Sequence, residues 1–226
     1  MTGRLLVPAL STFVMLVVLL GLGTWQVRRL AWKRGLLAQI DAAEQAPAQP
    51  LTGDPAPFAK VTVAGRLRGD RAALYGADVR DERSGPVLGG QLIEPLERQG
   101  SETVLVDLGW VPQTDWRRYA ADGPAGIDGY ARPADRQNWF SPADDPAQRL
   151  FYTLDPAAIG AALGLPGVAP FTLVALGPTP AHGFPDPAHA LPRPPNNHLQ
   201  YALTWYGLAL VLLVIFVSYA RKGVRA

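Results

Sequence analysis

Residues 194–207 read PPNNHLQYALTWYG, and within this stretch a polar region of the chain passes into an apolar one. The prolines end any preceding helix or strand, because proline lacks an amide hydrogen and fixes φ. Asn196 or Asn197 can then accept hydrogen bonds from the free amides of a first helical turn. Unbroken apolar sequence follows from Leu208 to Val217. The stretch therefore predicts the start of a membrane helix, with His198 at its mouth.

Two segments of the chain have the length and composition of membrane spans. Leu5 to Trp25 is uncharged, and residues 199–220 are equally apolar, with tyrosine or tryptophan near both ends. At 1.5 Å per residue, about 20 residues cross the roughly 30 Å hydrocarbon layer. A cleaved signal peptide is the alternative for the first segment, but basic residues follow it where a small-residue cleavage site should lie. We expect an uncleaved anchor, whose helix continues to about Glu44.

Two spans put both termini on the same side of the membrane. Lysine and arginine favour the cytoplasmic side, and Arg221, Lys222 and Arg225 follow the second span. A basic run after the first span argues for the opposite orientation: Arg28, Arg29, Lys33 and Arg34. We follow the second span, whose outer flank carries just Arg193, and expect both termini in the cytoplasm. The region between the spans then lies outside it.

That region, residues 46–195, has proline-rich linkers at both ends and period-two sequence between them. The alternation predicts short strands at residues 60–67, 72–79, 87–93, 103–111, 126–131, 150–154 and 172–176. One helix is predicted next to them, with Asp155 as its cap, Pro156 at its first position and Gly164 as its stop. We therefore expect a membrane protein with two transmembrane helices flanking a β-rich extracytoplasmic domain, a small antiparallel barrel or sandwich with one helix.

Composition and motifs argue against several classes of function. The net charge is only +2 and no basic patch is interleaved with aromatic residues, so we expect no nucleic-acid partner. The chain has no cysteine, which excludes disulfides, thiolate catalysis and thiolate metal sites. No Gly-x-Ser-x-Gly elbow occurs, and the spacing of His182, His189 and His198 is unlike the i, i+4 pair of a helical zinc site. We expect that the protein is not an enzyme.

His198 has the best prospects for chemistry. On a helix that begins near it, five small or aromatic residues lie on its face or beside it: Ala202, Trp205, Ala209, Phe216 and Tyr201. They predict a shallow apolar groove capped by an imidazole, and a neutral imidazole is a normal axial ligand of haem iron. The residues leave an alternative open, an interfacial histidine hydrogen-bonded to lipid headgroups or to its own domain.

The first helix carries its own cluster above the membrane. Trp25 and Trp32 are seven residues apart and so share one face, with Arg29 between them. Tryptophans at headgroup depth and cations on lipid phosphates are typical of an interfacial anchor. The alternative is a docking collar for a membrane partner or an anionic ligand.

Three motifs in the chain resemble those of the Surfeit locus protein 1 family. The first span is followed by Trp25-Gln26-x-x-Arg29-Leu30-x-Trp32-Lys33, and the second opens with Asn196-Asn197-His198-Leu199-x-Tyr201-Ala202-x-Thr204-Trp205-Tyr206-Gly207. Between them lies Val104-Leu105-Val106-Asp107-x-Gly109-Trp110-Val111-Pro112, which is similar to the family's central strand motif. The order of anchor, strand-rich domain and anchor also matches, so the resemblance covers nearly the whole chain.

The resemblance implies an assembly factor for haem-copper cytochrome c oxidase, which assists the insertion of haem a into subunit I. It implies transient binding of haem a, with His198 as the axial ligand and Tyr201 and Trp205 against the ring. Arg29 and Trp25 would face His198 across the two anchors, because an arginine fork suits planar carboxylates such as haem propionates. The implied partners are oxidase subunit I, haem a synthase and membrane lipids. The implied location is the bacterial inner membrane, with the central domain in the periplasm.

Two alternatives stay open at this point. A scaffold could hold oxidase subunit I in an assembly-competent state without binding haem, with both helix motifs serving as protein contacts. A membrane-tethered enzyme would need a pocket lined by ionisable residues in the outer domain, and the sequence offers no convincing set.

Overall fold

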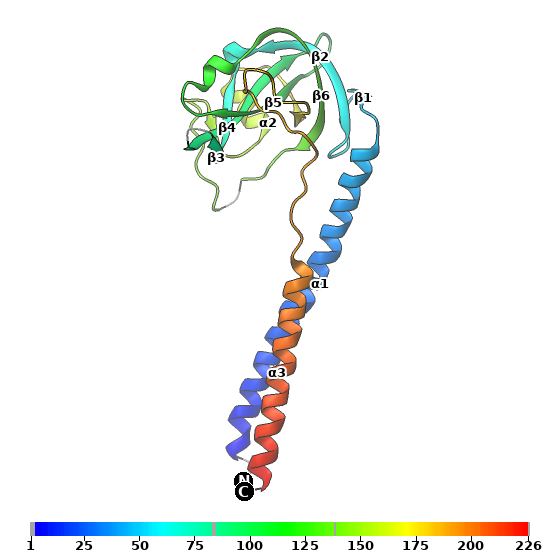
Figure 1. Cartoon of the computed structure of the whole chain (residues 1–226), viewed down its shortest axis with the longest axis vertical. Coiled ribbons are helices and arrows are strands. Elements are labelled where there is room, and N and C mark those ends of the chain that lie inside the picture. Colours follow the sequence, from blue (N-terminus) through cyan, green and yellow to red (C-terminus); the bar gives the residue numbers. More distant parts are fainter. Residues whose placement is uncertain (1–2, 83–84, 138, 226) are drawn as a thin grey trace. The chain divides into compact units, whose positions relative to one another are not determined.

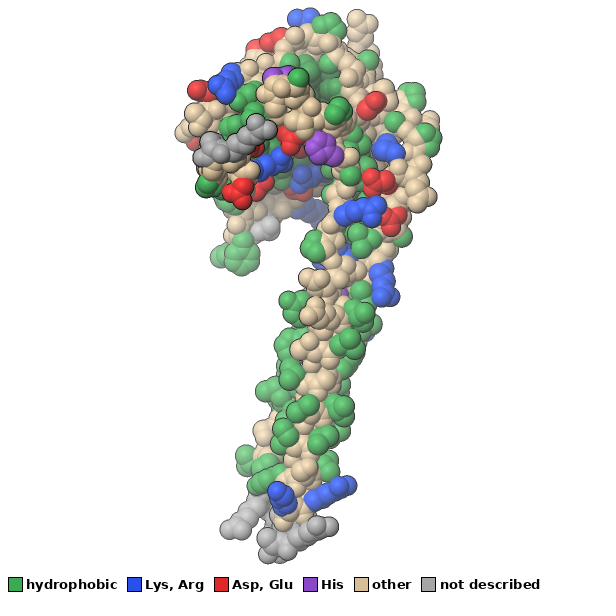
Figure 2. Space-filling view, viewed as in Figure 1, with side chains coloured by type: hydrophobic (Ala, Val, Ile, Leu, Met, Phe, Trp, Pro, Cys, Tyr) green, Lys and Arg blue, Asp and Glu red, His purple; other side chains and the backbone are tan. Residues whose placement is uncertain are grey.

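Two long helices carry the apolar segments in this computed structural model, which describes residues 3–82, 85–137 and 139–225 (Figure 1). Helix α1 spans Gly3–Gln45 and helix α3 spans His198–Arg225. Both are long and apolar enough to cross a membrane, yet only 6% and 11% of their most apolar stretches are buried inside the protein. Figure 2 shows the hydrophobic side chains along their visible surface. This apolar surface needs cover from outside the chain.

The chain divides into two units, a helical one made of residues 1–39 and 193–226 and a β domain made of residues 40–192. In the helical unit, the buried residues of α1 recur every three or four positions: Leu19, Gly23, Gln26 and Leu30. Those of α3 are Ala202 and Ala209. This spacing places one stripe of each helix in the contact between them, which we call the α1–α3 seam. Gly23 lets the two helices approach, since a Cβ at this position would lie 2.7 Å from Cε1 of Tyr206.

The β domain holds eight strands among the described residues. They are β1 (Gln49–Pro50), β2 (Lys60–Arg68), β3 (Ala73–Glu82), β4 (Gly85–Glu97), β5 (Thr103–Pro112), β6 (Asp122–Pro133), β7 (Leu150–Phe151) and β8 (Val168–Ala175). Three short helical elements accompany them, η1 (Gly69–Arg71), η2 (Trp116–Tyr119) and α2 (Pro156–Ala162). Asp155 caps α2 by accepting from the amides of Ala157 and Ala158, as its sequence position predicts.

The strand order is β1-β2-β6-β8-β5-β4-β3-β7, and an additional pairing of β2 with β4 closes β2, β6, β8, β5 and β4 into a ring. The longest ladder is antiparallel, from Lys60 opposite Tyr130 to Arg68 opposite Asp122. β5 and β8 run parallel, so the sheet is mixed rather than purely antiparallel. A parallel pair needs a long connection, and the chain supplies one by passing through β6, β7 and α2 between them.

Apolar side chains from the ring strands form the main core of the domain. This cluster includes Val61, Leu96, Val106, Ile127 and Leu173. A second cluster packs α2 against the sheet through Ile159 and Leu163, together with Leu105 and Phe151. Because apolar and exposed residues alternate along β2 and β6, the sequence pattern finds both strands.

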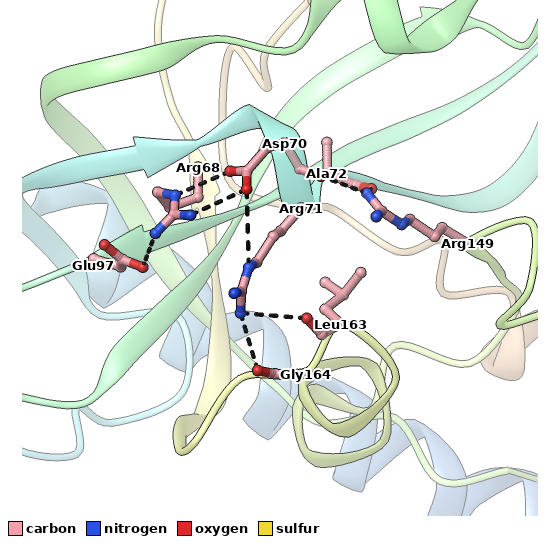
Figure 3. A network of polar contacts seen from close by, with 8 residues as sticks. All are labelled: Arg68, Asp70, Arg71, Ala72, Glu97, Arg149, Leu163 and Gly164. Carbon is pink, nitrogen blue, oxygen red and sulfur yellow. Dashed lines mark hydrogen bonds and ion pairs between the residues drawn. The ribbon is translucent and has the colours of Figure 1, made fainter.

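Polar contacts around η1 connect the ends of several strands (Figure 3). Arg68 binds Asp70 at 3.0 Å and Glu97 of β4 at 2.6 Å. Arg71 donates to the carbonyl of Gly164, just after α2, at 3.0 Å. Arg149 donates to the carbonyl of Asp70 at 2.7 Å. The turn after β2 is therefore tied to β4, to α2 and to the segment before β7.

The strand expected at residues 150–154 is shorter than predicted and ends at Phe151. The reason is Asp144, whose Oδ1 accepts from the amides of Tyr152 at 2.6 Å and Thr153 at 3.2 Å. A side chain thus takes amides that a sheet ladder would otherwise use.

Candidate functional site at the start of helix α3

The imidazole of His198 lies against α1 at the first position of α3. Its Nδ1 is 2.7 Å from Oε1 of Gln26, a residue 172 positions earlier in the chain. A side-chain carbonyl oxygen only accepts hydrogen bonds, so with Oε1 of Gln26 facing the ring this contact corresponds to the Nδ1–H tautomer of His198. Nε2 is then the ring nitrogen with a lone pair, which is the atom that a metal would use.

The surroundings of this pair are formed by the two helix ends. Gln26 is 8% exposed and belongs to the α1–α3 seam, between Gly23 and Leu30. Asn196, two residues before His198, has a buried Oδ1 with no hydrogen-bond partner among the described residues. Further along the seam toward the apolar segments, the Thr24 and Tyr206 hydroxyls lie 3.2 Å apart. The mouth of the helix pair is thus a small polar region above an apolar seam.

The two alanines expected to line a groove beside His198 are covered, and this corrects that part of the sequence-based interpretation. Ala202 and Ala209 are 2% and 4% exposed, because the seam buries them. Small residues on the face of the histidine serve helix packing here. Trp205 is half-buried, whereas Tyr201 is exposed. The apolar surface available to a ligand lies outside the seam.

The site residues predicted on α1, Trp25 and Arg29, also lie outside the seam. Trp25 is exposed, and the guanidinium of Arg29 stacks over the ring of Trp32, 3.9 Å from its centroid. Within the described contacts, the α1 residue that reaches His198 is Gln26, rather than Arg29 or Trp25. The sequence motif contains Gln26, but the motif alone does not distinguish it as a site residue. Its spacing from Gly23 and Leu30 is the signal that could have identified it.

The surroundings of His198 suit a site in which the protein supplies a single metal ligand. An imidazole whose Nδ1 donates to a carbonyl oxygen is the usual form of a histidine metal ligand. Among the described residues, no group of three or more histidine, aspartate or glutamate side chains could hold a metal ion. His198 is therefore a candidate single axial ligand, of the kind that haem accepts.

A second polar site lies in the β domain, in a cavity of about 250 Å³ whose lining includes Arg80, Asp107, Tyr130, Arg132 and Asp186. The two arginines are paired with acids, Arg80 with Asp186 and Arg132 with Asp135, at 2.8 Å each. Burial raises the pKa of Asp107 to about 6 and that of Tyr130 to about 12. The sequence offered no convincing set of ionisable residues in this domain, but the fold brings these together from separate strands.

The charged side chains of this cavity are held in ion pairs and hydrogen bonds. Its described lining contains carboxyl, phenol and guanidinium groups, but no serine, histidine or lysine. His189 borders the cavity, with Nε2 3.5 Å from Oδ1 of Asp186 and Nδ1 2.9 Å from the carbonyl oxygen of Gly177. The paired charges and the buried carboxyl are typical of a structural polar cluster. His198 thus remains the stronger candidate site.

Known proteins and a family model match this chain over most of its length. A model described as the SURF1 family matches residues 13–210. A SURF1-like protein of Monosiga brevicollis is 31% identical over 225 residues, which cover 92% of this chain and 85% of that protein. A SURF1-like protein of Rickettsia conorii is 30% identical over 93% of this chain and 90% of its own length. Surfeit locus protein 1 of Homo sapiens is 27% identical over 92% of this chain and 75% of its own length.

Proposed function

The chain belongs to the SURF1 family, and on this premise we propose that it is a membrane-anchored assembly factor for haem-copper cytochrome c oxidase. In this role it holds haem a transiently at His198 before the haem enters subunit I. The observation that carries the proposal is the His198–Gln26 hydrogen bond of 2.7 Å. It commits Nδ1 and leaves Nε2 as a ligand atom at the mouth of the helix pair.

The other site residues support a transient rather than a tight site. Tyr201 and Trp25 are exposed aromatic side chains on the two helices, and Trp205 is half-buried. These side chains offer flat apolar contact without enclosing a ligand. Arg29, stacked on Trp32, has guanidinium donors for a propionate. A carrier must release its cargo, and one axial ligand on an open surface suits release.

The proposed location is the bacterial inner membrane, with both termini in the cytoplasm and the β domain in the periplasm. Two apolar helices with little internal burial support the membrane assignment. The proposed partners are oxidase subunit I, a haem a synthase as donor, and the surrounding lipids. No enzymatic activity is proposed.

A visible spectrum of the purified protein tests the function directly. The full chain is purified from cells with and without haem a synthesis, and we expect a haem a spectrum only from the former. His198→Ala should remove most of this absorption, because it deletes the axial ligand. His189→Ala is the matched control, since His189 is exposed and lies in the β domain. A His198→Ala protein that retains its full complement of haem would refute the ligand role.

The scaffold alternative has a specific observation in its favour. The alanines on the His198 face are buried in the seam, so these two residues cannot line the expected haem groove. A scaffold would be colourless under both conditions and would still co-purify with oxidase subunit I. The same purification therefore separates the two functions.

A further inference from the structure

We propose that Gln26 is the positioning residue of His198: its side-chain carbonyl fixes the imidazole in the Nδ1–H tautomer and orients Nε2 away from α1. The effect of Gln26 on haem binding rests on the proposed function, whereas its effect on the His198 tautomer is independent of that function. The contact joins the residue that follows α1's apolar segment to the first residue of α3.

Burial and distance make this hydrogen bond a strong constraint. Gln26 is one of five buried polar or charged side chains among the described residues, and the others lie in the β domain: Glu94, Asp107, Thr153 and Thr172. At 2.7 Å the contact is short for a nitrogen–oxygen hydrogen bond. Because Gln26 is buried, water has little access to its carbonyl oxygen, and the partly buried environment strengthens the bond.

The position of Gln26 on α1 explains why the side chain cannot easily turn elsewhere. Leu19, Gly23 and Leu30 share its stripe, and all are buried in the seam. Gly23 brings α3 close through the Tyr206 ring. A glutamine of this length then reaches His198 directly, whereas the carbonyl of an asparagine would end one methylene short.

The chemical effect is on the ligand nitrogen. A histidine that donates its other N–H to a carbonyl oxygen is held in one orientation, and its ligand nitrogen becomes more basic. In water, imidazole prefers the opposite tautomer, with the proton on Nε2, which cannot bind a metal at that atom. Gln26 therefore keeps the coordinating lone pair available before any ligand arrives.

Nitrogen NMR of the ¹⁵N-histidine-labelled full chain in detergent tests the tautomer without haem. In the wild type we expect a protonated, pyrrole-type Nδ1 and a pyridine-type Nε2 at His198, which is assigned by its loss in His198→Ala. Gln26→Leu keeps a similar volume but removes the acceptor, so the Nε2–H form should appear. Gln26→Glu retains an acceptor and should preserve the Nδ1–H form. An unchanged His198 pattern in Gln26→Leu would overturn the proposal.

Titration with haemin then measures the consequence for binding. Loss of such a hydrogen bond costs roughly 10-fold to 100-fold in metal affinity, so we expect Gln26→Leu to bind haemin at least tenfold more weakly. Gln26→Glu, which keeps an acceptor, should bind haemin more tightly than Gln26→Leu does. Tyr206→Phe is the matched control, because it removes the Thr24 contact from the same seam and leaves Gln26 in place.

The outcomes separate this inference from the proposed function. If His198→Ala loses haemin while Gln26→Leu binds it as the wild type does, the axial ligand stands and the positioning role is wrong. If His198→Ala binds haemin normally, the ligand role fails, and the NMR tautomer alone decides the role of Gln26. If Tyr206→Phe weakens binding as much as Gln26→Leu, helix pairing rather than the histidine tautomer is responsible, and the proposal is overturned.

Discussion

At the scale of single residues, two buried carboxyl groups set the pH response of the β domain. Glu94 is fully buried, with Oε1 accepting from the amide of Ala121 at 3.0 Å and Oε2 without a partner among the described residues. Burial raises its pKa to about 7. Asp107 is also buried, accepts from the amide of Gly109 at 3.0 Å, and has a pKa of about 6 for the same reason. Both groups therefore keep their protons to a higher pH in the fold than in the unfolded chain.

The sign of the pH dependence follows from these raised values. A group that holds its proton more tightly when folded stabilises the fold below its unfolded pKa, and this contribution is lost as pH rises through the folded pKa. For Glu94 the window runs from about pH 4.5 to about pH 7. We expect the free energy of unfolding of the β domain to fall across this window by up to about 3 kcal/mol from Glu94 alone.

Glu94→Gln should remove this part of the dependence, because the amide does not titrate. Thermal unfolding of the full chain in detergent, followed by near-ultraviolet circular dichroism at pH 5 and pH 8, measures it. The smaller slope that remains should come from Asp107. Glu82→Gln is a control, since Glu82 is only half-buried at the end of β3. Equal pH slopes in wild type and Glu94→Gln would contradict the assignment.

At the scale of elements, the α1–α3 seam depends on one glycine. A Cβ at Gly23 would meet three atoms of the Tyr206 ring at 2.7–2.9 Å, closer than Cβ atoms in proteins come to other groups. Gly21 lies two residues earlier on the same helix, where a Cβ would meet nothing within 4 Å. The two positions therefore form a matched pair.

Gly23→Leu should separate the helices and weaken the contact of Gln26 with His198. Overpacking of this kind costs about 1–3 kcal/mol, which should lower the unfolding temperature of the helical unit in detergent. Gly21→Leu should cause no loss. Adding Tyr206→Ala to Gly23→Leu should restore part of the stability by clearing the ring. If both leucine variants melt alike, the seam is not packed as described.

Local sequence patterns predict some helices and strands of this fold, but they do not predict features that depend on distant residues. Period-two alternation identifies β2 because one face of that strand meets the core and the other meets solvent. Asp155, Pro156 and Gly164 identify α2 because caps and stops are local. The early end of β7 escaped prediction, because Asp144 acts from eight residues away on the amide of Tyr152. The parallel pairing of β8 with β5 is likewise a property of the chain path rather than of either strand.

For the whole molecule, the sequence motifs identify the family and His198, but not the neighbour of His198. Helical phase alone assigns Ala202 and Ala209 to the face of the histidine, and it cannot say that this face is covered by α1. The buried stripe of α1 resolves the question, because it places Gln26 rather than Arg29 in the seam. A pairwise contact between residues 172 positions apart depends on how two helices pack. A single helix pattern does not contain that information.

Membrane orientation is the remaining property of the whole chain, and its two basic clusters make opposite predictions. Arg221, Lys222 and Arg225 follow α3's apolar segment and favour a cytoplasmic C-terminus. Arg28, Arg29, Lys33 and Arg34 lie on the part of α1 that our orientation exports. In the proposed orientation this second cluster lies at the outer surface, where lipid phosphates and haem propionates carry negative charge, so we expect the C-terminal cluster to decide the orientation.

The absence of native cysteine makes this orientation directly measurable. In intact spheroplasts an impermeant maleimide should label Ser101→Cys, an exposed position of the β domain, and should label Ala226→Cys only after permeabilisation. Replacing Arg221, Lys222 and Arg225 by glutamine should give a mixed population, because the remaining charge asymmetry favours the reverse orientation. Glutamine at the four basic residues after the first span should leave the labelling unchanged while lowering haem retention. Labelling of Ala226→Cys in intact spheroplasts would put the termini outside, and the periplasmic assignment of the β domain would then be wrong.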